Sequence, residues 1–246
     1  MLNIFEVGGC VRDEILGVST NDIDFTFVIE DTNQTVDEGW DQMLSNLKEA
    51  GSKIFLETKE CFTVRAKFPK NHINEGLVAD FVMARKEVGY IDGTRKPILE
   101  LGTLLDDLVR RDFTINALAK DMDGNIIDPF GGVKHLKEGI LITPLDSRKT
   151  MMDDPLRILR ALRFSITKGF EVSEDIMEAM KQPNILEKLK TTVSQERIRE
   201  ELTKMMKFDT IKTMKLLVNI DNEFIHGFLN IIFEKDMWLN PTTKNK

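Results

Sequence analysis

Alternating apolar and polar residues in the first half of the chain predict β-strands. In residues 22–30, "DIDFTFVIE", every second side chain is apolar, and the opposite set includes Asp22 and Asp24. Further strands are predicted at 4–7, 53–58, 61–68 and 76–84. Helices are predicted over 11–16 and 34–50, and the Asp123-Gly124 turn predicts a hairpin. The first 140 residues therefore have the pattern of a mixed α/β domain.

Beyond about residue 150 the apolar period becomes helical. Helices are predicted over 154–167, 174–181, 194–206, 209–218 and 222–234. In the first, Pro155 suits the first helical position and Asp154 the N-cap. Its polar side collects Asp153, Asp154, Arg157, Arg160, Phe164 and Lys168. The predicted fold class is α+β, with a sheet domain at 1–140 followed by an all-helical domain at 141–246.

Composition and cysteine usage narrow the class of protein. The chain is 41% hydrophobic and 30% charged, which is ordinary for a folded domain. It has no apolar run of about 20 residues and no basic, apolar signal-like start. Cys10 and Cys61 form no CxxC pair, and three scattered histidines do not indicate a zinc site. We expect a cytoplasmic protein without membrane association.

The net charge of −7 is unevenly divided. Residues 1–140 carry 16 basic and 25 acidic side chains, whereas residues 141–246 carry 18 and 16. Within the second part, residues 148–168 hold six basic and two acidic side chains. The acidic part suits metal chemistry, and the local basic patch suits phosphates. A solvated helix face accounts for the patch equally well.

Two carboxylates lie beside a glycine turn near the start of the chain. Asp22 and Asp24 are two residues apart on a strand, so they project from the same face, where two charges repel unless a cation compensates. Magnesium prefers such oxygen ligands. Gly8 and Gly9 allow backbone N–H groups to approach an anion, and Arg12 follows one turn later. Solvated strand ends and a plain turn are the alternatives.

Two further polar groups interrupt apolar stretches. Asp80 lies within "GLVADFVMARKE", where a carboxylate is costly unless it binds a metal or pairs with Arg85, Arg12 or a backbone turn. The second group lies in "DLVRRDFTINALAKD" and comprises Arg110, Arg111, Asp112 and Asn116. Such side chains can hold a triphosphate and ribose hydroxyls, and a surface ion-pair cluster is the alternative.

Seven motifs in order relate the chain to a known family. They are "GGCVRD", "NDIDF", "ARKE", "RRDFTINALA", "DPFGG", "DDPLRILRALRFS" and "SQERIREEL". The chain resembles the bacterial-type (class II) tRNA nucleotidyltransferase and poly(A) polymerase family over residues 5 to about 205. The resemblance implies a polymerase-beta-like nucleotidyltransferase palm as the head, followed by a helical neck and a shortened body.

The resemblance also implies roles for individual residues. Asp22 and Asp24 match the metal-holding aspartates, and Asp80 a third catalytic acid. The nucleotide-binding candidates in the head are Gly8, Gly9, Arg12, Asp13, Arg110, Arg111, Asp112 and Asn116. Those in the neck are Asp153, Asp154, Arg157 and Arg160. Asp154 and Arg157 would read the base edges of C and A, while the family usually has glutamate where this chain has Asp153.

The expected activity is template-independent addition of C and A to the tRNA 3′ end, from CTP and ATP with two Mg²⁺ ions. A poly(A) polymerase, or an enzyme that adds only C or only A, is the alternative within the family. A catalytically silent RNA- or nucleotide-binding module is the alternative of another class. Because about 40 residues follow the last motif, we expect a partner subunit or a homodimer to complete the grip on RNA.

Overall fold

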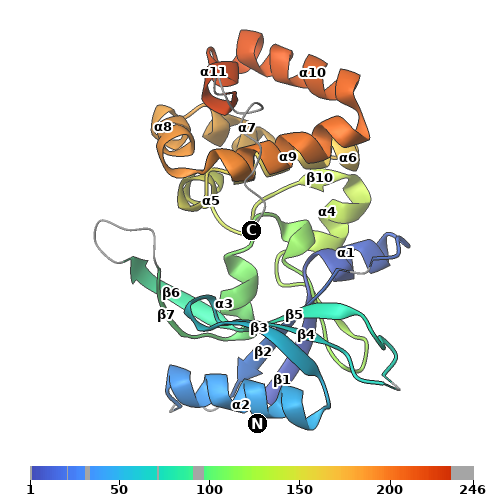
Figure 1. Ribbon diagram of the computed structural model, residues 1–246. Helices are drawn as coiled ribbons and strands as arrows, with labels where there is room; N and C mark the ends of the chain where they lie inside the picture. Colours follow the sequence, from blue (N-terminus) through green and yellow to red (C-terminus); the bar gives the residue numbers. More distant parts are fainter. Residues whose placement is uncertain (1, 21, 31–33, 71, 91–96, 234–246) are drawn as a thin grey trace, which may run out of the picture. The chain divides into compact units, whose positions relative to one another are not determined.

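The computed structural model describes residues 2–20, 22–30, 34–70, 72–90 and 97–233, and divides the chain into two compact units, residues 1–134 and 135–246 (Figure 1). The first unit contains the sheet and the second is almost entirely helical. A functional boundary between residues 140 and 141 stays a prediction. Among the helices that the structure describes, none combines the length and the apolar character that a membrane crossing requires.

The first unit is organised around a seven-stranded mixed sheet. Its strands are β1 (Leu2–Val7), β2 (Ile23–Ile29), β3 (Lys53–Thr58), β4 (Thr63–Lys67), β5 (Val78–Met83), β8 (Ala119–Lys120) and β9 (Ile126–Ile127). They lie in the order β3-β4-β5-β2-β1-β8-β9. β2 and β5 are parallel, and the other neighbours are antiparallel. The predicted mixed sheet is therefore present, with β2 at its centre.

One face of this sheet carries the main core. The helical elements of the unit are α1 (Gly9–Ile15), α2 (Val36–Glu49), η1 (Lys59–Cys61), α3 (Leu104–Val109), η2 (Thr114–Asn116) and the start of α4 (Gly132–Glu138). Trp40 and Met43 of α2 pack with Phe25 and Phe27 of β2, all buried. The predicted apolar face of β2 thus forms the core, and Thr26 on the opposite face of the strand donates to Asp107 of α3.

A second, two-stranded sheet was not anticipated from the sequence. β6 (Arg85–Tyr90) and β7 (Pro97–Leu101) form an antiparallel hairpin. Val88 and Ile98 on these strands are 45% and 47% exposed. Because the hairpin exposes apolar side chains, its sequence lacks the alternation that a half-buried strand produces.

The second unit is a bundle of short helices. They are α5 (Ser147–Asp153), α6 (Arg157–Thr167), α7 (Glu174–Met180), α8 (Pro183–Thr192), α9 (Gln195–Phe208), α10 (Thr210–Asn219), η3 (Ile220–Phe224) and α11 (Phe228–Ile232). β10 (Ile140–Leu141) pairs in parallel with β11 (Glu171–Val172). Ile158, Leu159 and Leu162 of α6 are completely buried or nearly so, as predicted for its apolar side.

The helix predicted over 154–167 begins later than expected. α5, which was not predicted, ends at Asp153, and a turn through Pro155 separates it from α6. The Asp154 side chain still accepts the N–H of Leu156, at 3.2 Å, so it caps the turn before the helix. Phe164 was predicted on the polar side but is buried, because α6 packs against both α5 and α9.

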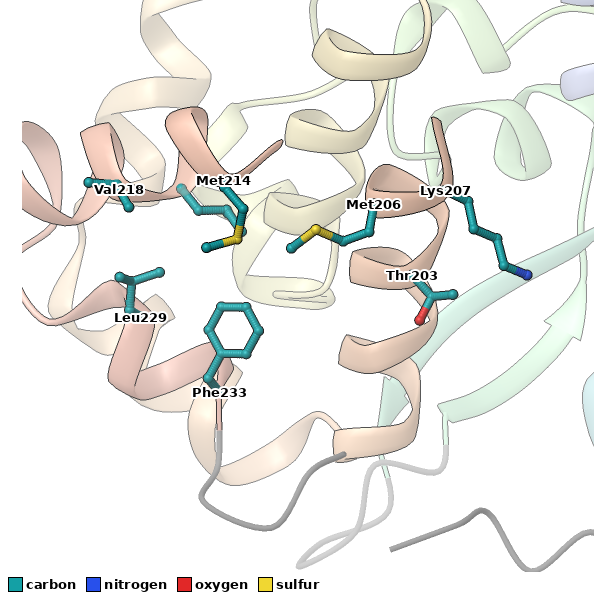
Figure 2. A pocket seen from close by; sticks show the side chains of 8 residues that line it. Thr203, Met206, Lys207, Met214, Val218, Leu229 and Phe233 are labelled. Atoms are coloured by element: carbon teal, nitrogen blue, oxygen red, sulfur yellow. The ribbon is translucent and has the colours of Figure 1, made fainter. Parts of the chain in front are cut away.

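An apolar cavity lies between α9, α10 and α11 (Figure 2). Its volume is about 690 Å³, and it is lined by Thr203, Met206, Lys207, Met214, Leu217, Val218, Leu229 and Phe233. Figure 2 shows Met206 and Met214 reaching into it from neighbouring helices. Phe208 and Ile211, which join α9 to α10, are 62% and 70% exposed. This end of the bundle is therefore unusually apolar at its surface.

Candidate functional site

Three strands of the sheet align two acids and a base across the sheet. Asp24 on β2 lies opposite Asp80 on β5, and Asp80 lies opposite Arg65 on β4. Asp22 directly precedes β2 and is exposed. Residues in register on adjacent strands project to the same face, so the structure brings the predicted acids Asp22, Asp24 and Asp80 into one neighbourhood.

Asp24 is the most perturbed of these acids. Burial raises its pKa first, the charge of Asp22 raises it further, and the charge of Arg111 only partly offsets both, so its pKa is about 6. A cation beside Asp22 and Asp24 would relieve this strain, and carboxylate oxygens are ligands that suit Mg²⁺. In the described part of the chain, no three side chains of His, Cys, Asp or Glu are arranged to hold a metal together. Asp22 and Asp24 offer carboxylate donors of the kind that Mg²⁺ prefers.

Asp80 is already paired. The Arg65 guanidinium donates from Nε to Oδ1 and from Nη2 to Oδ2, each at 2.6 Å. Asp80 therefore forms an ion pair, as one of the two alternatives predicts, but its partner is Arg65. Arg85 donates instead to the carbonyl oxygen of Cys61, and Arg12 donates to Asn116.

Four predicted nucleotide-binding residues form one hydrogen-bonded chain. Arg12 donates to both carboxylate oxygens of Asp13, at 2.9 Å, and through Nη1 to Oδ1 of Asn116, at 2.5 Å. Asn116 donates through Nδ2 to Oδ1 of Asp112, at 2.9 Å. The same oxygen accepts the N–H of Phe113. Residues more than 100 positions apart are therefore joined into a rigid arrangement beside the start of α1.

Gly8 has a structural task at this point. Its φ of 80° lies in the region that favours glycine, and its N–H donates to the carbonyl oxygen of Leu118, at 3.0 Å. The Gly8 N–H is therefore already used within the first unit, and the approach of other backbone N–H groups of this turn to an anion stays a prediction. A Cβ atom on Gly8 would lie 2.5 Å from Nη1 of Arg111. Gly8 instead allows Arg111 to approach the turn.

Asp107, which was not among the predicted site residues, holds both predicted arginines. Its carboxylate is completely buried, Oδ1 accepts from Arg110, and Oδ2 accepts from Arg111 at 2.8 Å and from the Thr26 hydroxyl at 3.1 Å. Burial by itself would raise its pKa, but the charges of Arg111 and Arg110 outweigh burial and lower the pKa to about 2. The helical i, i+3, i+4 spacing of these three residues is the signal that could have identified Asp107.

Arg111 connects the two polar clusters of the first unit. Its Nη1 lies 3.4 Å from the carbonyl oxygen of Asn116, and its charge acts on Asp24. Its Nε is buried and has no hydrogen-bond partner among the residues that the structure describes. A buried donor without a partner is costly, so it marks a position where an anionic ligand would be favoured.

The candidates of the second unit lie around the turn between α5 and α6. Asp154 accepts from Arg197 of α9, with Nη2 to Oδ2 at 2.8 Å, and Arg157 donates to the carbonyl oxygen of Thr150 at 3.0 Å. Asp153 is exposed and Arg160 half-buried.

Glu201 is buried and accepts from Arg163 of α6 at 2.5 Å. Glu201 of α9 also accepts from Lys204 of the same helix, at 3.2 Å. Ser194 caps α9, because its hydroxyl accepts the N–H of Arg197. Helix α9 therefore braces α6 and the turn before it.

The chain matches a family of known proteins. Residues 4–142 match the family described as the poly A polymerase head domain. The chain belongs to this family. The matched residues include every head candidate from Gly8 to Asn116, whereas Asp153, Asp154, Arg157 and Arg160 lie beyond them.

Relatives of this chain are similar to it over a larger part of its length than residues 4–142. A multifunctional CCA protein of Nitrosomonas eutropha is 36% identical over 185 residues, which cover 74% of this chain and 39% of that protein. A crystal structure of the Bacillus stearothermophilus CCA-adding enzyme in complex with CTP has a TM-score of 0.71 at 26% identity and covers 92% of this chain and 50% of that one. A tRNA nucleotidyltransferase complexed with a primer tRNA and an incoming ATP analog has a TM-score of 0.68 at 28% identity, with 95% and 60% covered. The α+β nucleotidyltransferase fold is thus shared, although the chain spans only 39% to 60% of these proteins.

Proposed function

We propose that this chain is an RNA nucleotidyltransferase that adds C and A residues to the 3′ end of tRNA from CTP and ATP. The observation that carries the proposal is that Arg111 shares the Asp107 carboxylate with Thr26, which lies on the same face of β2 as Asp24. The names and titles of the relatives, which mention CCA addition, CTP, tRNA and an ATP analog, support the choice of substrates. In the reaction, the RNA 3′-hydroxyl attacks the α-phosphorus and pyrophosphate leaves.

Asp22 and Asp24 are the residues that would hold Mg²⁺. When bound, two such ions would lower the pKa of the 3′-hydroxyl and stabilise the charge on the leaving pyrophosphate. Arg111 would donate to the triphosphate from its buried Nε. Arg12, Asp112 and Asn116 would fix the geometry of the nucleotide, because each is already immobilised by the others.

We expect the Asp154 carboxylate, as a hydrogen-bond acceptor, to select the base of the incoming nucleotide. This carboxylate accepts from Arg197 and from the N–H of Leu156, so it is held as an acceptor. An acceptor suits the exocyclic amines of cytosine and adenine and disfavours the carbonyl groups of uracil and guanine. Arg157, anchored to Thr150, would donate to the ring acceptors of the same bases.

The grip on RNA and the role of Asp153 stay predictions. Asp153 is one methylene shorter than the glutamate usual in the family, and its exposed position leaves it available to Arg160 or to a substrate. A partner subunit or homodimer that completes RNA binding, and a cytoplasmic location, are kept as expectations of the same kind.

The direct test uses the purified chain with Mg²⁺, labelled CTP or ATP, and tRNAs that end before, within or after CCA. We expect ordered addition that stops after the terminal A and that is lost in Asp24→Asn. Long A-only tracts would favour the poly(A) polymerase alternative, and addition of only C or only A would favour a partial enzyme. Nucleotide binding without incorporation would favour the catalytically silent module.

A further inference from the structure

The pairing of Asp80 differs from what a third metal ligand requires. Each of its oxygens accepts a charged hydrogen bond from Arg65, and the two contacts have the parallel geometry of an arginine–carboxylate fork. The Asp80 side chain is 24% exposed and that of Arg65 47% exposed. Solvent therefore reaches both side chains, and the two parallel hydrogen bonds fix the position of the Asp80 carboxylate.

The sheet itself enforces this pairing. Arg65 and Asp80 are direct partners on the antiparallel strands β4 and β5, and this row continues to Asp24 on β2. Asp80 can therefore turn toward Arg65 on one side or toward Asp24 on the other. It is turned toward Arg65, and the described residues provide no three-ligand metal group.

We propose that Arg65 is a positioning residue that holds Asp80 out of metal coordination, so that the resting metal site has only the two carboxylates Asp22 and Asp24. This inference rests on the proposed function, which assigns those two aspartates to the metal. Neutralising Asp80 limits the negative charge that an incoming triphosphate must approach. Arg65 thereby sets a balance between affinity for the metal and affinity for the nucleotide.

Binding of Mn²⁺ to the purified full chain, followed by the electron paramagnetic resonance of free Mn²⁺ without nucleotide, tests this inference. We expect Asp80→Asn to change the Mn²⁺ Kd by less than about twofold, because Asp80 is not a ligand. We expect Arg65→Met to free Asp80 and lower the Mn²⁺ Kd by about fivefold or more. The double variant Arg65→Met/Asp80→Asn should return close to the wild-type value.

Lys67→Met is the matched control, because Lys67 lies two residues along β4 on the same face and its register partner is Val78. If it tightens Mn²⁺ binding as much as Arg65→Met, the effect is one of general charge and the positioning role is refuted. If Asp80→Asn weakens binding as strongly as Asp24→Asn, Asp80 is a ligand and the inference is overturned. Unchanged binding in Asp24→Asn would instead contradict the metal site of the proposed function. Should Arg65→Met fail to fold, Arg65→Gln, which also removes the charge, replaces it, and an unchanged Mn²⁺ Kd in that variant refutes the positioning role.

Discussion

The substitution Asp107→Asn removes the charge that both neighbouring arginines share while keeping the shape of the side chain. Asp107 is completely buried, and its pKa is about 2 in the folded chain, below the ordinary value of 3.8. A carboxylate with a lowered pKa stabilises the fold above its unfolded-state pKa, and the contribution disappears as the pH falls from about 4 to about 2. The gap between the two values corresponds to about 2–3 kcal/mol at neutral pH.

Urea unfolding from pH 3 to pH 7 measures this contribution. In a Trp238→Phe background the fluorescence comes from Trp40, which is buried in the first unit. We expect the free energy of unfolding of Asp107→Asn to be lower by about 2–3 kcal/mol at pH 7 and by only about half of that at pH 3. Thr26→Val is the control, because it removes one hydrogen bond to Asp107 but keeps the carboxylate and both arginines, so its cost of about 1 kcal/mol should change much less with pH.

The reasoning is refuted if Asp107→Asn costs less than about 0.5 kcal/mol at pH 7, since surface ion pairs already contribute that much. A cost that is the same at pH 3 and pH 7 would also refute it. In that case the destabilisation would come from packing and not from the charge of the carboxylate.

Three further variants test separate parts of the structure. Gly8→Ala should cost about 1–3 kcal/mol in urea unfolding and weaken CTP binding by isothermal titration, because its φ is unfavourable and its Cβ meets Arg111. Stability and CTP affinity that both match wild type would contradict this. Arg197→Met should lower the ratio of kcat/KM for CTP over UTP about tenfold by releasing Asp154. An unchanged ratio would mean that Asp154 needs no support. Thr35→Ala should cost about 1 kcal/mol in urea unfolding by removing the cap of α2, and no loss would contradict the capping geometry.

The sequence predicted those parts of the fold in which burial leaves a periodic pattern. The face of β2 that carries Phe25 and Phe27 is buried as expected, and so is the apolar side of α6. The hairpin formed by β6 and β7 was not predicted, because Val88 and Ile98 are exposed and the buried apolar pattern of β7 is limited to Leu99 and Leu101. The turn at Pro155 was not predicted, because apolar residues at helical spacing lie both before and after it.

The candidate site was predictable in composition but not in its connections. Arg12, Asp112 and Asn116 were selected from motifs, and the structure joins them directly. Asp107 was not selected, since one acid beside two arginines resembles a surface cluster and its burial depends on β2 and α3 packing together. Arg65 was missed for a similar reason, because strand register is a property of the folded sheet and not of either strand alone.

The apolar cavity between α9, α10 and α11 affects how the protein can be studied. Environment-sensitive dyes fluoresce when they enter apolar openings, and this cavity offers about 690 Å³ with methionine and phenylalanine walls. A dye-based melting experiment would therefore begin from a high signal in the folded state, and detergent from purification would compete for the same space. Substitution of Met214, which lines the cavity and is 46% exposed, by a polar residue should reduce that background. Tryptophan fluorescence and circular dichroism avoid this interference and suit the stability measurements above.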